Sequence, residues 1–154
     1  VRRSNITGKK TGSKRRGWPI LPKGANKMKF EFVANDVSYT YEDGVHVLGM
    51  VDRGNEPHDY VILQRGTEFD EQDRKLGQDT YYIEVCADGV AGYGGVKSVT
   101  LNAGKLSIEL EDDAKWREDL SSIQIDVQAA KDLEGLKAWL LAIFSGTSTS
   151  IALD

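Results

Sequence analysis

The sequence predicts an α+β domain, built from a curved antiparallel sheet of about six to eight strands with a C-terminal helix on one face. Two observations predict this fold class. Apolar and polar residues alternate through most of residues 28–127, which is typical of half-buried strands. After Ala129 the apolar period changes to 3.6 residues, which indicates an amphipathic helix. We therefore expect one domain over residues 28–146, followed by a C-terminal tail over residues 147–154.

Eight short runs of residues carry the strand pattern. They cover residues 28–32, 39–41, 45–51, 60–65, 80–86, 96–101, 105–110 and 123–127. Asp43-Gly44 separates the second and third runs and is a strong signal for a two-residue hairpin turn. The segment 102–104 predicts a three-residue hairpin loop, with Gly104 in the left-handed conformation. The polar residues 52–59 predict a loop between the third and fourth runs.

The C-terminal helix is predicted by an apolar stripe with helical spacing. Leu133, Leu136, Leu140 and Phe144 recur every three or four residues, and charged residues lie largely on the opposite side. Gly146 is well placed to end this helix, because glycine readily adopts the left-handed conformation that commonly follows a helix C-terminus. We expect the apolar stripe to face the sheet.

The net charge of −4 conceals two oppositely charged regions. Residues 1–27 contain nine basic residues and no acidic one, whereas residues 28–154 contain eleven basic and 24 acidic residues, for a net charge of −13. The basic segment has no periodicity and is expected to be disordered. It is either a basic arm for nucleic acid or a non-native leader. We hypothesise a leader, because codons for residues 23–25 can contain a ribosome-binding sequence shortly before Met28.

Composition excludes several classes of protein. No apolar stretch approaches the ~18 residues that a membrane span requires, and no secretory signal follows the basic start. Cys86 is the single cysteine, so neither an internal disulfide nor a multi-cysteine metal site can form. These features predict a cytoplasmic protein without a cofactor or a membrane partner. An acidic body of this charge repels nucleic acid and favours basic partners.

The segment after the fourth run is rich in acidic residues and predicts a short helix over residues 68–76. Thr67 and Asp70 form an N-terminal capping pattern, and a glycine follows the last turn. Phe69 and Leu76 are seven residues apart, so they share one helix face and are expected to pack the helix on the sheet. The helix then displays its acids to solvent, which are Glu68, Asp70, Glu71 and Asp73.

These four acids allow three interpretations: calcium ligands, an acid/base pair, or a surface that imitates the charge of phosphate. Their spacing lacks the calcium-loop pattern and its turn glycine, and no histidine or cysteine neighbours them in sequence. We therefore predict a protein-binding surface, with no catalytic and no metal site. Aromatic and acidic residues elsewhere can extend it, so the full set of partner-binding candidates is Glu68, Asp70, Glu71, Asp73, Tyr82, Glu84, Tyr93 and Trp116.

Other reactive or polar residues have simpler structural interpretations. The glycine-rich segment 92–95 could cradle a phosphate, but it lacks a Walker lysine and a following helix, so a tight bend is favoured. His46 and His58 are isolated and are expected on the surface. Cys86 has no activating base nearby in sequence and is expected to be a packed, inert thiol. Trp116 either anchors an interface or folds back on the core.

Four blocks of sequence then indicate a family. They occur in order at residues 60–65 (YVILQR), 69–73 (FDEQD), 76–84 (LGQDTYYIE) and 92–95 (GYGG). Together they resemble the Immunity protein 10 family, small bacterial proteins encoded beside polymorphic toxins; Gln78 departs from the apolar residue expected there. The resemblance implies an antitoxin that binds and neutralises a cognate toxin without catalysis. It leaves the chemistry of the toxin open.

Charge supports this implied function and suggests a kind of target. Many toxin domains act on nucleic acid through basic clefts, and a strongly acidic protein is steered towards such a cleft. We therefore expect occlusion of a toxin, such as a nuclease with a basic cleft, by an acidic surface. The alternative is a non-catalytic binding module for a basic protein partner or a small ligand outside toxin systems. An enzyme is a third reading, and no nucleophile, base and orienting group occur together in the chain.

Overall fold

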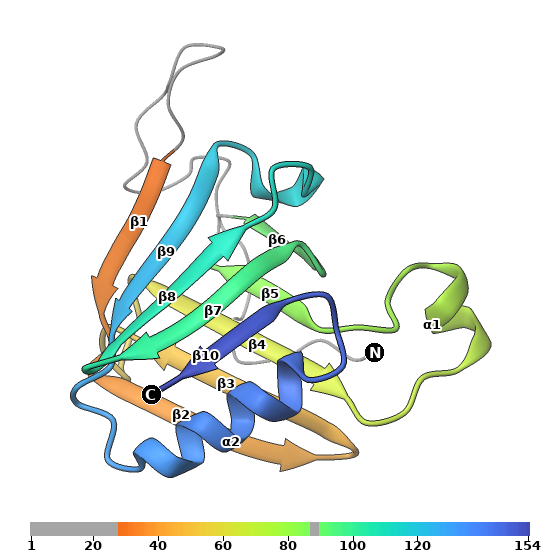
Figure 1. Cartoon of the computed structure of the whole chain (residues 1–154). Coiled ribbons are helices and arrows are strands. Elements are labelled where there is room, and N and C mark those ends of the chain that lie inside the picture. The colour runs from red at the N-terminus through yellow and green to blue at the C-terminus, as the bar shows by residue number, and fades with distance from the viewer. Residues whose placement is uncertain (1–27, 87–89) are drawn as a thin grey trace.

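Ten strands in the described part of the chain form two five-stranded sheets (Figure 1). The computed structural model describes residues 28–86 and 90–154, so the expectations for residues 1–27 lie outside the described residues. The first sheet has the order β1-β9-β8-β7-β10. Its strands are β1 (Met28–Val33), β7 (Val96–Asn102), β8 (Lys105–Leu110), β9 (Leu120–Asp126) and β10 (Ser150–Leu153).

The second sheet has the order β2-β3-β4-β5-β6 and is antiparallel throughout. Its strands are β2 (Asp36–Glu42), β3 (Val45–Val51), β4 (Tyr60–Gly66), β5 (Tyr82–Val85) and β6 (Val90–Tyr93). The helices are α1 (Glu71–Lys75), the 3-10 helix η1 (Lys115–Arg117) and α2 (Leu133–Phe144). None of the helices described is long and apolar enough to cross a membrane.

The α+β class and the C-terminal helix are confirmed, but the strands form two sheets where we expected one. Both edges of the first sheet are also parallel, because β1 pairs with β9 and β10 pairs with β7. Alternation of apolar and polar residues determines which face of a strand is buried, and it carries no information about the neighbouring strand. The expected C-terminal tail over 147–154 includes β10, whose Ile151 and Leu153 pack against the core.

Both predicted hairpins form, and each has a two-residue turn. Asp43 and Gly44 have φ values of 54° and 76°, as the turn between β2 and β3 requires. Ala103 and Gly104 have φ values of 53° and 77° between β7 and β8. Asn102 pairs with Lys105 in the sheet, so only two residues remain in the loop where we expected three.

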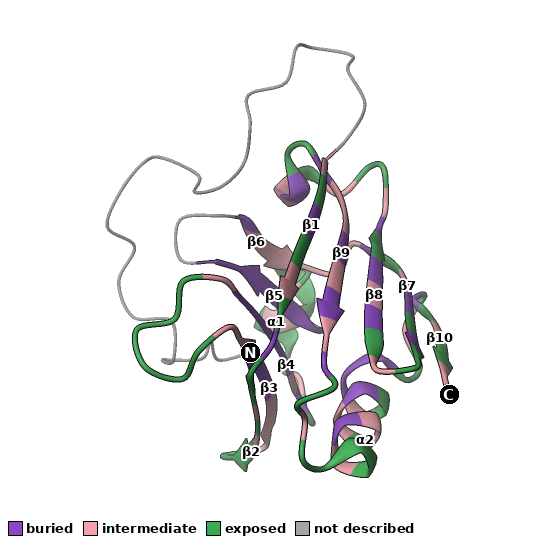
Figure 2. Cartoon of the chain, turned by 90° about the vertical axis from the view of Figure 1, so that its left-hand side faces the viewer, coloured by how far each residue is buried: buried purple, intermediate pink, exposed green. Residues whose placement is uncertain are grey.

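The core lies between the two sheets and α2 (Figure 2). Helix α2 contacts β2, β3, β4 and β10, and its stripe of Leu136, Leu140, Ile143 and Phe144 is completely buried. The ring of Phe144 meets Tyr81 edge-on at 4.7 Å between ring centroids. Burial of such a stripe supplies most of the stability of an amphipathic helix. The helix ends as predicted, with Gly146 at a φ of 76°.

Candidate interaction surface

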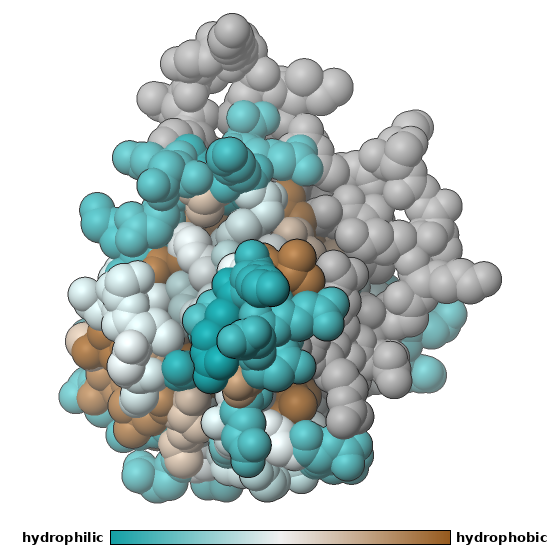
Figure 3. Space-filling model, turned by 90° about the vertical axis from the view of Figure 1, so that its right-hand side faces the viewer, coloured by the Kyte–Doolittle hydropathy of each residue, from teal (hydrophilic) through white to brown (hydrophobic). Residues whose placement is uncertain are grey.

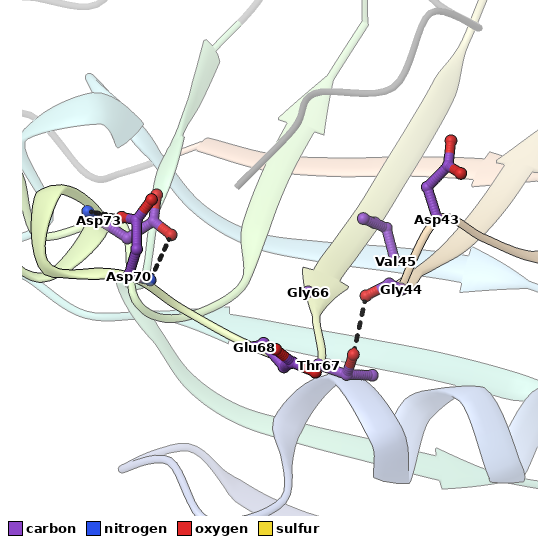
Figure 4. Close-up of a pocket in the computed structure, with 8 residues that line it drawn as sticks. All are labelled: Asp43, Gly44, Val45, Gly66, Thr67, Glu68, Asp70 and Asp73. Atoms are coloured by element: carbon purple, nitrogen blue, oxygen red, sulfur yellow. Dashed lines mark hydrogen bonds between the residues drawn. The ribbon is translucent and has the colours of Figure 1, made fainter.

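An acidic hollow of about 540 Å³ lies between the β2–β3 turn and the segment that leads from β4 into α1 (Figure 4). Carboxylates come from both sides of the hollow, and none of its lining residues among residues 28–86 and 90–154 is basic. The lining residues are Asp43, Gly44, Val45, Gly66, Thr67, Glu68, Asp70 and Asp73. Three of the predicted partner-binding acids therefore meet here with a fourth acid, Asp43, for which we predicted only a place in a turn.

The two walls of the hollow are tied together by the sheet. Val45 and Gly66 are paired where β3 and β4 meet, which places the β2–β3 turn beside the end of β4. Thr67 then donates two hydrogen bonds to the carbonyl oxygen of Gly44, from its backbone N–H at 2.8 Å and from its hydroxyl at 3.1 Å. The position of Asp43 relative to Glu68 therefore follows from strand register.

Helix α1 fixes the remaining acids through a reciprocal capping box. The Asp73 N–H donates to the Asp70 carboxylate at 2.7 Å, and the Asp70 N–H donates to the Asp73 carboxylate at 3.0 Å. Asp70 is thus the N-terminal cap, and the helix is shorter than the predicted 68–76. Thr67 was expected in the capping pattern, but its hydroxyl is used by Gly44. Asp70 is the more favourable cap, because the Asp73 carboxylate in turn accepts a hydrogen bond from the Asp70 N–H.

Packing of α1 differs from the prediction. Leu76 is 59% exposed and Phe69 is half-buried, so the expected pinning of the helix by Leu76 is wrong. No residue of α1 is buried. The helix projects from the body on an extended segment in Figure 1, and hydrophilic residues gather over it in Figure 3. Its acids therefore form a display surface that little packing constrains.

Two arginines near these acids in the sequence bind backbone carbonyl groups. Arg65, at the end of β4, donates to the carbonyl oxygens of Ile143 at 3.1 Å and Ser145 at 2.7 Å. These carbonyls lie at the C-terminus of α2, where the helix dipole favours a cation. Arg74, on α1, donates to the carbonyl oxygen of Phe69 at 3.0 Å. Both guanidinium groups thus bind backbone carbonyl oxygens.

Two other predicted partner-binding residues lie below the surface. Tyr82 and Glu84, both on β5, are 2% and 6% exposed. The hydroxyls of Tyr82 and Tyr60 donate to the two carboxylate oxygens of Glu84, at 2.8 and 3.2 Å. Tyr93 is half-buried, and its ring packs tilted against that of Tyr82 at 5.2 Å between ring centroids. These three candidates are therefore separate from the lining of the hollow.

Trp116 accounts for the glycine-rich segment. Its indole packs against Gly92 and Gly95, where an added Cβ would overlap the ring, and its N–H donates to the carbonyl oxygen of Gly94 at 3.1 Å. The side chain is half-buried. The glycines thus permit close approach of an aromatic ring at a tight bend, which matches the interpretation of Trp116 as folded back on the core.

A comparison with models of known protein families identifies the family of this chain. The family model described as Immunity protein 10 matches residues 33–135, which is two thirds of the chain. The chain belongs to the Immunity protein 10 family. The matched region contains both walls of the hollow, helix α1 and the start of α2. A comparison with curated proteins finds no match. Membership in the Immunity protein 10 family indicates an immunity protein, a class whose partners are cognate toxins and which is generally non-catalytic.

Proposed function

We propose that this immunity protein acts in the cytoplasm, where it binds a cognate toxin and occludes it through the acidic surface of the hollow and α1. The observation that carries the proposal is the convergence of Asp43, Glu68, Asp70 and Asp73 on one hollow in a member of an immunity family. A lysine or arginine of the toxin that enters the hollow meets carboxylates from two directions. Such charge-assisted hydrogen bonds are roughly twice as strong as neutral ones.

Charge also supports a target with a basic cleft. The 24 acids and 11 bases of residues 28–154 steer the protein towards positive surfaces and raise the association rate. Carboxylates on a projecting helix can occupy the positions that phosphates take in a nuclease. The same hollow suits a binding module for a basic protein or a small ligand outside toxin systems, and family membership favours the toxin.

Co-expression with the toxin encoded beside the gene tests the proposal. The wild-type protein should restore growth and co-purify with the toxin. The E68K/E71K variant should lose growth rescue and co-purification, because it reverses two charges of the proposed surface. It should remain folded, because Glu68 and Glu71 are exposed and take no part in the capping box. The matched control is E31K/E109K, which makes the same charge change at exposed positions on the other sheet and should protect fully. Full protection by E68K/E71K would contradict the proposed surface.

A further inference from the structure

The loop between β3 and β4 gathers side chains of the kinds that bind metal ions. Asp52, His58 and Asp59 each offer one ligand atom, and these atoms lie within 4.8 Å of one another. A Zn²⁺ ion bound at about 2.0–2.2 Å from nitrogen and oxygen ligands needs such a group, drawn slightly closer together. The set combines one imidazole with two carboxylates, so it is more than a solvated acidic patch.

Strand pairing brings these residues together although they are up to seven positions apart. Val51 pairs with Tyr60 at the end of the β3–β4 ladder, and the Asp52 N–H donates to the Asp59 carbonyl oxygen at 2.9 Å. The two aspartates therefore stand opposite each other at the base of the loop. The backbone N–H of His58 donates to the Asp52 carboxylate at 3.0 Å, and its ring Nδ1 lies 3.2 Å from the Asp59 carboxylate.

A further carboxylate comes from β2. Asp36 pairs with Val51, so it lies at the same end of the sheet. Its carboxylate is so close to Gly54 that an added Cβ would overlap it. Asp36 thus adds a carboxylate beside the same loop, outside the group of ligand atoms. Within the group, a divalent cation would relieve the repulsion between the carboxylates of Asp52 and Asp59. Solvent reaches the group, since the side chains of His58 and Asp59 are 53% and 30% exposed.

We propose that Asp52, His58 and Asp59 form a binding site for Zn²⁺. Imidazole nitrogen favours zinc and similar transition metals, whereas sites for magnesium and calcium consist of oxygen ligands. The site lies at the opposite end of β3 and β4 from the acidic hollow, which is formed around Val45 and Gly66. It is therefore independent of the proposed toxin surface.

Calorimetric titration of the full chain with ZnCl₂, after chelator treatment and without a histidine tag, tests the site. One Zn²⁺ should bind per chain, and H58A and D59N should each weaken binding by about tenfold or more, since even outer-shell changes cost that much. Calcium and magnesium should bind more weakly than zinc. Circular dichroism shows that each variant remains folded.

The matched control is H46A, because His46 lies between the rings of Tyr41 and Trp139, away from the cluster. H46A should bind zinc like the wild-type protein. Zinc should also raise the melting temperature of the wild-type protein and of H46A, but not that of H58A. The proposal is overturned if the wild-type protein binds no zinc, if H58A and D59N bind it as the wild type does, or if H46A abolishes binding.

Discussion

The two α-helices among the described residues begin alike and differ in almost everything else. Asp70 caps α1 and Asp132 caps α2, each through a hydrogen bond from a backbone N–H three residues later. Helix α2 has 12 residues and buries four apolar side chains between the sheets, whereas α1 has five residues and buries none. The comparison shows that a cap can start a helix, and that packing decides whether the helix supports the fold.

This difference separates a structural element from a display element. Changes in the buried stripe of α2 remove apolar contacts and leave cavities. Changes in the exposed acids of α1 alter the electrostatic field with little effect on packing. We therefore expect stability to depend on α2 and partner recognition to depend on α1 and the hollow beside it.

The largest expected effect is loss of stability in F144A. Phe144 is completely buried and packs edge-on against Tyr81, so its removal leaves a large cavity. The free energy of unfolding should fall by about 3–5 kcal/mol, measured by urea denaturation. L141A, on the same helix at a position 47% exposed, should change it by less than about 0.5 kcal/mol. Equal losses in the two variants would contradict the structural role of the buried stripe.

Tyr81, the partner of Phe144, should also contribute through its hydroxyl. That hydroxyl accepts from the Val96 N–H at 2.9 Å and lies 2.8 Å from the Thr149 hydroxyl. Y81F therefore removes a hydrogen-bond partner from both of these buried groups. We expect a loss of about 1–3 kcal/mol in the free energy of unfolding. Burial raises the pKa of Tyr81 above its ordinary value of 10.0.

The sign of this shift gives a pH test of the same residue. A raised tyrosine pKa means that the folded protein favours the neutral phenol, so the stability contribution is present below pH 10 and is lost as the pH rises above it. The free energy of unfolding, measured by urea denaturation from below to above pH 10, should fall less with rising pH in Y81F than in the wild-type protein. An identical pH dependence would contradict the assignment.

D70A probes the cap of α1 and should have a smaller, local effect. It removes the side chain that accepts from the Asp73 N–H at 2.7 Å. Loss of a helix cap costs about 0.5–2 kcal/mol, and because α1 buries no residue the cost should be confined to this helix. Hydrogen exchange should accelerate in residues 71–75 and stay unchanged in α2. Acceleration in both helices would show that α1 supports the fold.

The smallest expected effect on stability is that of E68K/E71K. Both side chains are exposed and lie outside the capping box. The free energy of unfolding should change by no more than about 0.5 kcal/mol per substitution. Thermal unfolding of this variant beside E31K/E109K provides the measurement. A large loss in E68K/E71K alone would show that α1 is more than a display element.

Local features of the fold were predictable, and long-range ones were not. The spacing of Leu136 and Phe144 predicts α2, and Asp43-Gly44 predicts the turn between β2 and β3. Both signals depend only on residues that are close together in the sequence. The pairing of Met28 with Leu120 has no local signal, so the parallel edge and the second sheet were missed. Strand β10 is only four residues long, too short for alternation to distinguish it from a tail.

The candidate surface was predictable in part for the same reason. Glu68 and Asp73 are near each other in the sequence, so the sequence alone predicted that they lie on the same surface. Asp43 joins them through strand register, which the sequence pattern does not encode. Tyr82 and Glu84 lie on the same face of β5, which the alternation with Ile83 and Val85 predicts to be exposed. In this strand all four residues are buried. Burial of both faces depends on neighbours distant in sequence.

We propose that the acidic surface of the hollow and α1 binds the toxin. The most direct test is the dissociation constant of the purified toxin with the wild-type protein, E68K/E71K and E31K/E109K, at low and high salt. E68K/E71K should bind about 30-fold or more weakly, because each reversed charge opposes a basic group in the interface. E31K/E109K should stay close to the wild-type value. Equal affinity of the two variants for the toxin would contradict the account.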